Sequence, residues 1–255
     1  YVMSNFTDFI GGGGGATLET VILTTSQTWT PPLNGTGIIH VIGGGASGSG
    51  DGFRRSGGAG GYSRKAVTFA TGTNWTIVVG AGGTPTEDDN GVVAGGNSTA
   101  TDGSSSLTAN GANTTGVGGS ASGGDVNFTG GYGGGVGPLL GGGGAVGVFA
   151  NGSTTKSESG GQTTDANGGA DSFLVLGLGQ LIGGSGGGSD GANGGFLSGG
   201  ANNVANGTTG SYYVSGGKGG IGGGGGCGYN ASHATYRVGG DGGDGLVVIQ
   251  YLTVT

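Results

Sequence analysis

Charged residues are scarce in this chain. They make up 8% of its 255 residues, with 7 lysines and arginines against 14 acidic residues and a formal net charge of −7. Proteins that bind nucleic acid or anionic lipid surfaces usually present clustered lysine and arginine, and this composition lacks that footprint. No apolar run reaches the roughly 18 residues of a membrane-spanning helix. We therefore expect neither a nucleic-acid partner nor insertion into a membrane.

Cysteine, proline and histidine are also rare, and each shortage excludes a class of protein. The single cysteine, Cys227, leaves no internal disulfide and is interpreted as a small buried side chain. The 4 prolines, without a Gly-X-Y period, exclude a collagen triple helix. The two histidines, His40 and His233, have no neighbouring motif that would make either a catalytic base. We expect no catalytic residues, so the chain is interpreted as a protein that is not an enzyme.

Glycine is what the chain has in excess. It supplies 76 residues, many of them in unbroken runs between about 116 and 245, where neither helix propensity nor strand alternation survives. A disordered Gly/Ser linker is one interpretation, but such linkers contain few apolar residues, and here apolar clusters such as 173–178 separate the runs. The alternative is a set of packed rods with polyproline-II-like geometry, whose outward N–H and C=O groups bond to neighbouring rods.

Strand-like segments bracket this glycine-rich body. They lie at 17–30, 38–42, 65–69, 75–79 and 246–252. We expect 65–69 and 75–79 to form an antiparallel pair across a turn, 17–30 to form another strand pair, and the apolar last strand to be central. The predicted fold class is all-β: a jelly-roll-like β-sandwich from the terminal strands, with an inserted glycine-rich, polyglycine-II-like layer.

Residues 1–15 differ from the rest of the chain. Residues 1–10 alternate like a strand, with Val2, Phe6 and Ile10 on one face. The five residues that follow are all glycine: Gly11, Gly12, Gly13, Gly14 and Gly15. A strand on a flexible linker is what donation to a neighbouring subunit requires, because main-chain pairing supplies affinity and alternate side chains fill pockets. The alternative is a terminal strand that folds back onto its own sheet.

The sequence also predicts which residues of the donated strand contact the neighbouring subunit. The residues expected to contact the neighbouring subunit are Val2, Phe6, Phe9 and Ile10, and the glycines at 11–15 are the expected linker. Because the first residue is Tyr1, we expect a processed form or a fragment.

Many of the asparagines stand in Asn-x-Ser/Thr sequons. More Asn-x-Ser/Thr sequons occur than the serine and threonine content predicts, which indicates a surface made in a glycosylating, extracellular environment. An abundance of threonine is the alternative explanation. The possible glycosylation sites are Asn5, Asn34, Asn74, Asn97, Asn113, Asn127, Asn151, Asn206 and Asn230.

Three motifs match chemical sites in their letters only. The strand at 38–42 and its following glycines fit a dinucleotide fingerprint, but no acidic residue follows at the required distance of about 20 positions. A calcium-binding nonapeptide at 239–247, with Asp241 and Asp244, occurs once, whereas stacked turns must supply those ligands jointly. A nucleophile-elbow pattern at 183–187 lacks a histidine base. We expect no cofactor and no metal ion.

Four segments together resemble a known family. They are GTGIIHVIGGG at 35–45, GGAGGYS at 57–63, WTIVVGAGG at 75–83 and GGDGLVVI at 242–249. The series resembles the glycine-rich domain of tailed-phage fibre adhesins and secreted bacterial surface proteins, and a similar arrangement occurs in the extracellular part of anaplastic lymphoma receptor kinases. The resemblance implies a small jelly-roll-like sandwich with polyglycine-II helices packed hexagonally beside it. In phage tip adhesins the loops between glycine rods bind the host receptor.

These patterns lead to a functional expectation. Residues 1–15 are expected to be a tethered strand and linker, and 16–255 a single sandwich domain with the glycine-rich insertion at about 81–244. The primary hypothesis is an extracellular structural subunit that polymerises into a helical fibre through its N-terminal strand. The alternative is a tip adhesin of the phage-fibre type that binds a glycan or another cell-surface receptor.

Overall fold

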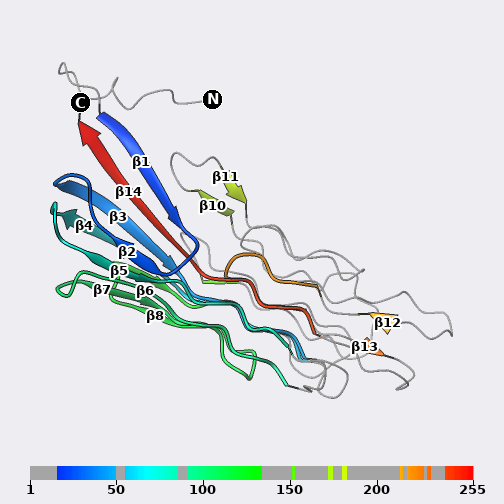
Figure 1. Cartoon of the computed structure of the whole chain (residues 1–255). Helices are drawn as coiled ribbons and strands as arrows, with labels where there is room; N and C mark the ends of the chain where they lie inside the picture. Colours follow the sequence, from blue (N-terminus) through cyan, green and yellow to red (C-terminus); the bar gives the residue numbers. More distant parts are fainter. Residues whose placement is uncertain are drawn as a thin grey trace.

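Two antiparallel sheets of five strands each form the body of the protein (Figure 1). The computed structural model describes residues 16–49, 55–85, 91–133, 151–152, 172–174, 180–182, 213–214, 217–226, 229–230 and 239–254. These described residues contain strands and no helix. The predicted all-β class and the central position of the last strand are therefore confirmed.

The strands of each sheet are few and mostly short. Sheet A has the order β1 (Ala16–Leu23), β14 (Leu246–Val254), β3 (Gly35–Ile42), β4 (Tyr62–Phe69) and β9 (Val126–Phe128). Sheet B has the order β2 (Gln27–Trp29), β5 (Trp75–Val78), β6 (Ser98–Thr101), β7 (Ser106–Ala109) and β8 (Ala121–Ser122). Two small hairpins pair β10 (Ser172–Leu174) with β11 (Gln180–Ile182), and β12 (Tyr213–Val214) with β13 (Tyr229–Asn230).

The hydrophobic core lies between the two sheets. Alternation places one face of every long strand inward, and Trp75 and Phe69 meet there edge to face with ring centroids 6.0 Å apart. Burying a large aliphatic or aromatic side chain stabilises the fold by about 1.5–3 kcal/mol. The buried members of the core are Leu23, Ile39, Val41, Val67, Phe69, Trp75, Ile77, Ala100, Leu107, Ala109, Val247 and Ile249.

Two predicted strand pairs are wrong, because their members lie in opposite sheets. β4 pairs with β3 and β9, whereas β5 pairs with β2 and β6. The turn between them, closed by the Thr73 N–H to Ala70 C=O bond and containing Gly72 at φ 82°, is an arch over the core. β1 and β2 likewise pair with β14 and β5. Local alternation gives each segment an apolar face, but it does not determine whether two successive segments pair in one sheet or face each other across the core.

The segments that connect the strands form a glycine-rich layer beyond one end of the sandwich (Figure 1). At its centre is the rod 43–49, which leaves β3 and is buried along its length. Successive N–H groups of this rod donate to three different neighbours, and the sequence of neighbours repeats every three residues. Gly43, Ala46 and Ser49 donate to 55–61, Gly44 and Ser47 to 91–97, and Gly45 and Gly48 to 239–245, over 2.8–3.0 Å.

A three-residue period of donation is the signature of a polyproline-II-type helix, which has three residues per turn and no internal hydrogen bonds. The carbonyls of the central rod are used in the same way: those of Gly44, Gly45 and Ala46 accept from Ala112, Gly83 and Gly225. The N–H groups of the central rod thus donate to three rods, and its carbonyls accept from three others. Six rods therefore surround it. The polyglycine-II layer predicted from composition is therefore present in the described residues.

The rod layer continues the hydrogen-bond register of the sheets. Ile42 pairs with Tyr62 at the end of the β3–β4 ladder, and the next residue along, Gly43, donates to Gly61. The ladders β3–β14, β4–β9, β5–β6, β6–β7 and β7–β8 extend into rods in the same manner. The layer thus arises from connections between many strands, and it includes 43–49 and 55–61, which lie before the insertion predicted at about 81–244.

Glycine is required where rods touch, because no space remains for a side chain. A Cβ atom on Gly57 would collide with the backbone carbonyl of Ala46, and one on Gly45 with that of Gly223. Some residues with side chains face outward, and others make small apolar contacts, such as Ala46 against Val92 and Ala112. The buried Ser47 hydroxyl instead accepts from the Val93 N–H of a neighbouring rod at 2.8 Å. On the outer rods the exposed residues recur every third position: Ala81 and Thr84; Gly91, Ala94 and Asn97; Val117 and Ser120; Thr129 and Tyr132.

Amide hydrogen exchange should distinguish the bonded N–H groups of the rods from those at exposed positions of the outer rods. We expect the N–H groups of Gly44, Gly45 and Gly57 to exchange slowly, because each is buried and bonded to a carbonyl of a neighbouring rod. Ala94, exposed on an outer rod, should exchange quickly. Residue-resolved exchange measured by NMR provides the test, and uniformly fast exchange along 43–49 would contradict the lattice.

Substitution at a contact between rods should be far more damaging than substitution at the lattice margin. We expect Gly57→Ala to lower the free energy of unfolding by about 3 kcal/mol, because the added methyl group overlaps the Ala46 carbonyl. Gly91→Ala is the matched control, since an added Cβ meets no atom within 4 Å there. Urea unfolding of both variants is the measurement, and equal losses of stability would be evidence against close packing.

Candidate functional site

The edge of sheet A at β1 is the most distinctive surface feature of the sandwich. β1 has eight residues and pairs along its whole length with β14 on one side. On its other side no strand is paired with it among the described residues. Figure 1 shows β1 at the margin of the sheet, beside β14. An unpaired edge presents a row of backbone donors and acceptors that another strand can use.

Apolar side chains adjoin this edge on the outer face of sheet A. Val21 and Leu23 point into the core, so Leu18 and Ile22 project from the opposite face and are 36% and 46% exposed. Ile38 of β3 lies across the sheet on the same face and is 37% exposed. Leu18, Ile22 and Ile38 are called the outer apolar patch below. Sequence analysis placed 17–30 in strands but did not single these residues out, because apolar residues at 18 and 21–23 occupy both faces.

Thr20 lies between Leu18 and Ile22 on that face. Its hydroxyl oxygen is buried and has no hydrogen-bond partner, and it is the one side-chain polar atom in this condition among the described residues. Buried polar groups in proteins normally find a partner. The edge therefore combines unpaired backbone, exposed apolar side chains and an unsatisfied hydroxyl.

The predicted donor segment falls outside the described residues. This applies to the expected contact residues Val2, Phe6, Phe9 and Ile10 and to the glycine linker at 11–15. The glycine linker is followed directly by Ala16, the first residue of β1. The segment and the free edge are thus adjacent in the chain.

Most of the predicted glycosylation sites lie on the described surface. Asn5 and Asn206 are outside the described residues, and Asn230 is in β13, where only the backbone is described. The other six are exposed: Asn34, Asn74, Asn97, Asn113, Asn127 and Asn151. In each of the six the side-chain oxygen accepts a hydrogen bond from another residue of the chain.

Asn113 shows that the sequon pattern also has a structural use. Its side-chain oxygen accepts from the N–H of Thr115 at 2.9 Å, from the hydroxyl of Thr115 at 2.8 Å and from the N–H of Val117 at 3.0 Å. Asparagine followed two positions later by threonine thus closes a local turn at the end of a rod. At Asn127 the amide nitrogen itself donates to Gly124 C=O at 2.8 Å, so a glycan on that nitrogen would compete with this bond.

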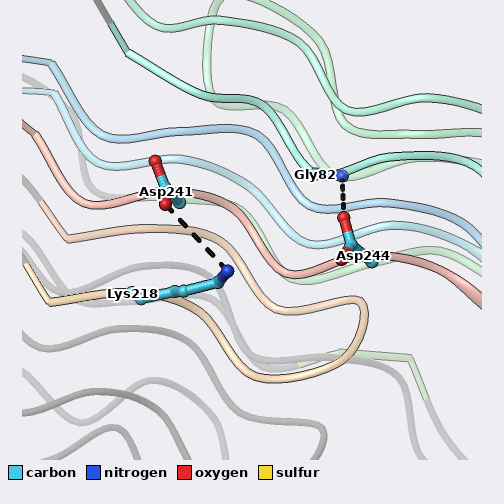
Figure 2. Close-up of polar contacts among 4 residues, drawn as sticks. All are labelled: Gly82, Lys218, Asp241 and Asp244. Atoms are coloured by element: carbon cyan, nitrogen blue, oxygen red, sulfur yellow. Dashed lines mark hydrogen bonds and ion pairs between the residues drawn. The ribbon is translucent and has the colours of Figure 1, made fainter.

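The acidic pair that resembled a calcium site has other interactions (Figure 2). The Asp244 carboxylate accepts from the Gly82 N–H at 2.8 Å and so ties the last rod to the rod that follows β5. The Asp241 carboxylate lies 4.0 Å from the Lys218 ammonium, in an exposed pair of the kind that contributes little to stability. No group of three or more metal-ligating side chains occurs in the part of the chain that the structure describes.

The nucleophile-elbow pattern at 183–187 lies outside the described residues, as do Cys227 and His233. The glycines after β3, which resembled a dinucleotide fingerprint, form the central rod, and their N–H groups are bonded to other rods. No helix that is long and apolar enough to cross a membrane was found among the described residues.

His40 forms a buried polar cluster on the outer face of sheet A. The side-chain oxygen of Gln250 can only accept, so Nε2–H of His40 donates to it over 3.2 Å. Nδ1 then accepts from the Tyr62 hydroxyl over 2.8 Å. Burial lowers the pKa of His40 to about 4; the Gln250 hydrogen bond opposes this shift and the Arg64 charge adds to it. Burial also raises the pKa of Tyr62. The cluster is neutral and links β3, β4 and β14.

Acid should destabilise the protein through His40. Because its pKa is near 4 in the folded chain and 6.5 when unfolded, the unfolded state binds the proton more tightly between these values. Stability should therefore fall as pH drops from about 6.5 to 4, by about 3 kcal/mol in all. Unfolding by urea from pH 7 to pH 4 should show that fall in the wild type and a smaller one in His40→Gln. Parallel pH profiles for the two proteins would contradict this assignment.

Comparison with known proteins agrees with this architecture. A family model described as a glycine-rich domain matches residues 20–252, a span that begins in β1, ends in β14 and includes every described rod. A search of curated proteins found no match. The family match covers most of the 255 residues. The chain belongs to the glycine-rich domain family.

Proposed function

We propose that this protein is an extracellular structural subunit that assembles into a fibre, with residues 1–10 of each copy added as a strand to the sheet of the next. Homo-oligomerisation into a helical polymer follows from this arrangement, because a head-to-tail contact that does not close on itself generates a filament.

The observation that carries the proposal is the composition and place of the N-terminal segment. Among the described residues the core runs from Leu23 to Ile249, and both sheets have five strands. Ahead of β1, an alternating apolar segment is joined to the sandwich by five glycines, which is the arrangement that strand addition to another molecule requires.

The rod layer supports a structural role. Backbone hydrogen bonds between neighbouring rods hold the layer together. Charged residues make up only 8% of the chain. The layer extends the sandwich mainly through these backbone bonds, with a small apolar cluster of Ala46, Val92 and Ala112 inside it. Exposed sequon asparagines such as Asn34, Asn74 and Asn113 support an extracellular, glycosylated surface.

Receptor binding by the layer is a second candidate function, favoured by one exposed apolar pair. Val117 and Tyr132 lie opposite each other on neighbouring rods joined by the Gly133 N–H to Gly116 C=O bond, and they are 38% and 39% exposed. Exposed tyrosine beside an apolar residue is typical of recognition surfaces. A tip adhesin would use this surface, with a glycan or another cell-surface molecule as its receptor.

Deletion of residues 1–15 separates the two functions. We expect the deletion to preserve the β-sandwich, because every described core residue is retained, and to abolish polymers. Electron microscopy of full-length and shortened protein at equal concentration is the measurement, with circular dichroism and thermal unfolding as the control for folding. Filaments from the shortened protein would overturn strand donation, and discrete particles from both forms would favour the adhesin.

A further inference from the structure

We propose that the outer face of sheet B binds ice, because its rows of threonine and serine side chains hold water in positions that match the surface of an ice crystal. This activity goes beyond the structural role proposed above and does not depend on it.

Hydroxyl side chains occupy nearly all the outward positions of sheet B. Trp75, Ile77, Ala100 and Leu107 point into the core, so the residues that alternate with them project from the opposite face. The outward residues are Thr28, Thr76, Val78, Thr99, Thr101, Ser106, Thr108 and Ser122. All but Val78 have a hydroxyl group and none is charged. This set is called the hydroxyl array.

The register of the strands arranges the hydroxyl array in two parallel rows. One row contains Thr28, Thr76, Thr101 and Ser106, and the second contains Val78, Thr99, Thr108 and Ser122. Within a row, neighbours lie on adjacent strands about 4.7–4.9 Å apart. The two rows are separated by two positions along each strand, which is about 6.4–6.8 Å. Strands β5 to β8 lie together along one side of the molecule (Figure 1).

These two spacings are close to those of ice. Water molecules in ice are bonded tetrahedrally at about 2.75 Å, the usual O–H···O distance, which places second-neighbour oxygens about 4.5 Å apart and repeats the puckered layers about every 7.3 Å. Both repeats agree with the hydroxyl array to within about a tenth. A hydroxyl group has one donor and two acceptor lone pairs, so it can replace a water molecule of the lattice.

Most hydroxyl groups of the array are available to water. Thr101 donates to the Ser105 C=O at 2.8 Å. The hydroxyls of Thr76, Thr99 and Thr108 make no hydrogen bond to another group within the described part of the chain. The array also lacks charged groups, which would hold their own hydration water too strongly to release it to a crystal.

The preference of threonine for strands does not by itself explain the array. If that preference decided the outward residues, both sheets would show it. The outer face of sheet A instead carries the outer apolar patch, His40 and Arg64, with one exposed threonine pair, Thr36 opposite Thr68. The concentration of hydroxyl groups is therefore a property of sheet B.

Strand twist determines which part of the array can match a flat crystal surface. Neighbouring strands rotate by about 20–25°, so residues at the two ends of a row leave the plane of its centre. The matching area is therefore centred on β6 and β7, where Thr99 lies opposite Thr108.

A bulky side chain at this centre should abolish ice binding. We expect the full-length protein to show thermal hysteresis, a gap between melting and freezing points, and to enter growing ice. Thr99→Tyr with Thr108→Tyr should lose both properties, since the rings hold the surface away from the crystal. Tyrosine favours strands, so the sheet should be preserved. The matched control is Thr36→Tyr with Thr68→Tyr, an exposed cross-strand threonine pair on sheet A, which should retain both.

Circular dichroism and thermal unfolding verify that each variant is folded. If the sheet B double variant unfolds, Thr76→Tyr at an exposed position of the array replaces it. Loss of ice binding in the sheet B variant alone supports the proposal. A wild-type protein that stays in the liquid and shows no hysteresis would overturn it, as would equal losses in both double variants. A sheet B variant that changes only the association of copies, with ice binding intact, would also overturn it.

Discussion

The structure depends on one constraint, that backbone N–H and C=O groups removed from water must be hydrogen-bonded. In the sandwich the sheet ladders meet this constraint. In the rod layer no ladder and no helix is present among the described residues, and each rod is bonded to several others. That arrangement is possible only where side chains are absent at the contacts, as at Gly45 and Gly57.

The sandwich and the layer are parts of one hydrogen-bonded system. Because the pairing of β3 with β4 continues from Ile42–Tyr62 to Gly43–Gly61, the sheets determine which rods become neighbours and in what register. Glycine loses more conformational freedom on folding than any other residue, so the rods need such a template. The hydrophobic core supplies the stability that holds the ends of the rods in place. A substitution that destabilises the core is therefore expected to destabilise the layer as well. Substitutions at the exposed positions of the outer rods are expected to have little effect on stability.

The same division bears on assembly. The described core runs from Leu23 to Ile249, and β1 pairs with β14 on one side, with no strand on its other side in the part of the chain that the structure describes. Leu18 and Ile22 are exposed beside this edge, and the buried Thr20 hydroxyl between them has no hydrogen-bond partner.

Much of this protein could be predicted from its sequence, because composition and alternation act locally. Glycine runs interrupted by apolar residues and an apolar last strand together indicated a β-sandwich with a polyglycine layer. Only the tertiary structure decided which strands share a sheet, because the turn at Gly72 has the same local signals whether it closes a hairpin or an arch. It alone identified 43–49 as the central rod and exposed the β1 edge, since these depend on contacts between residues far apart in the chain.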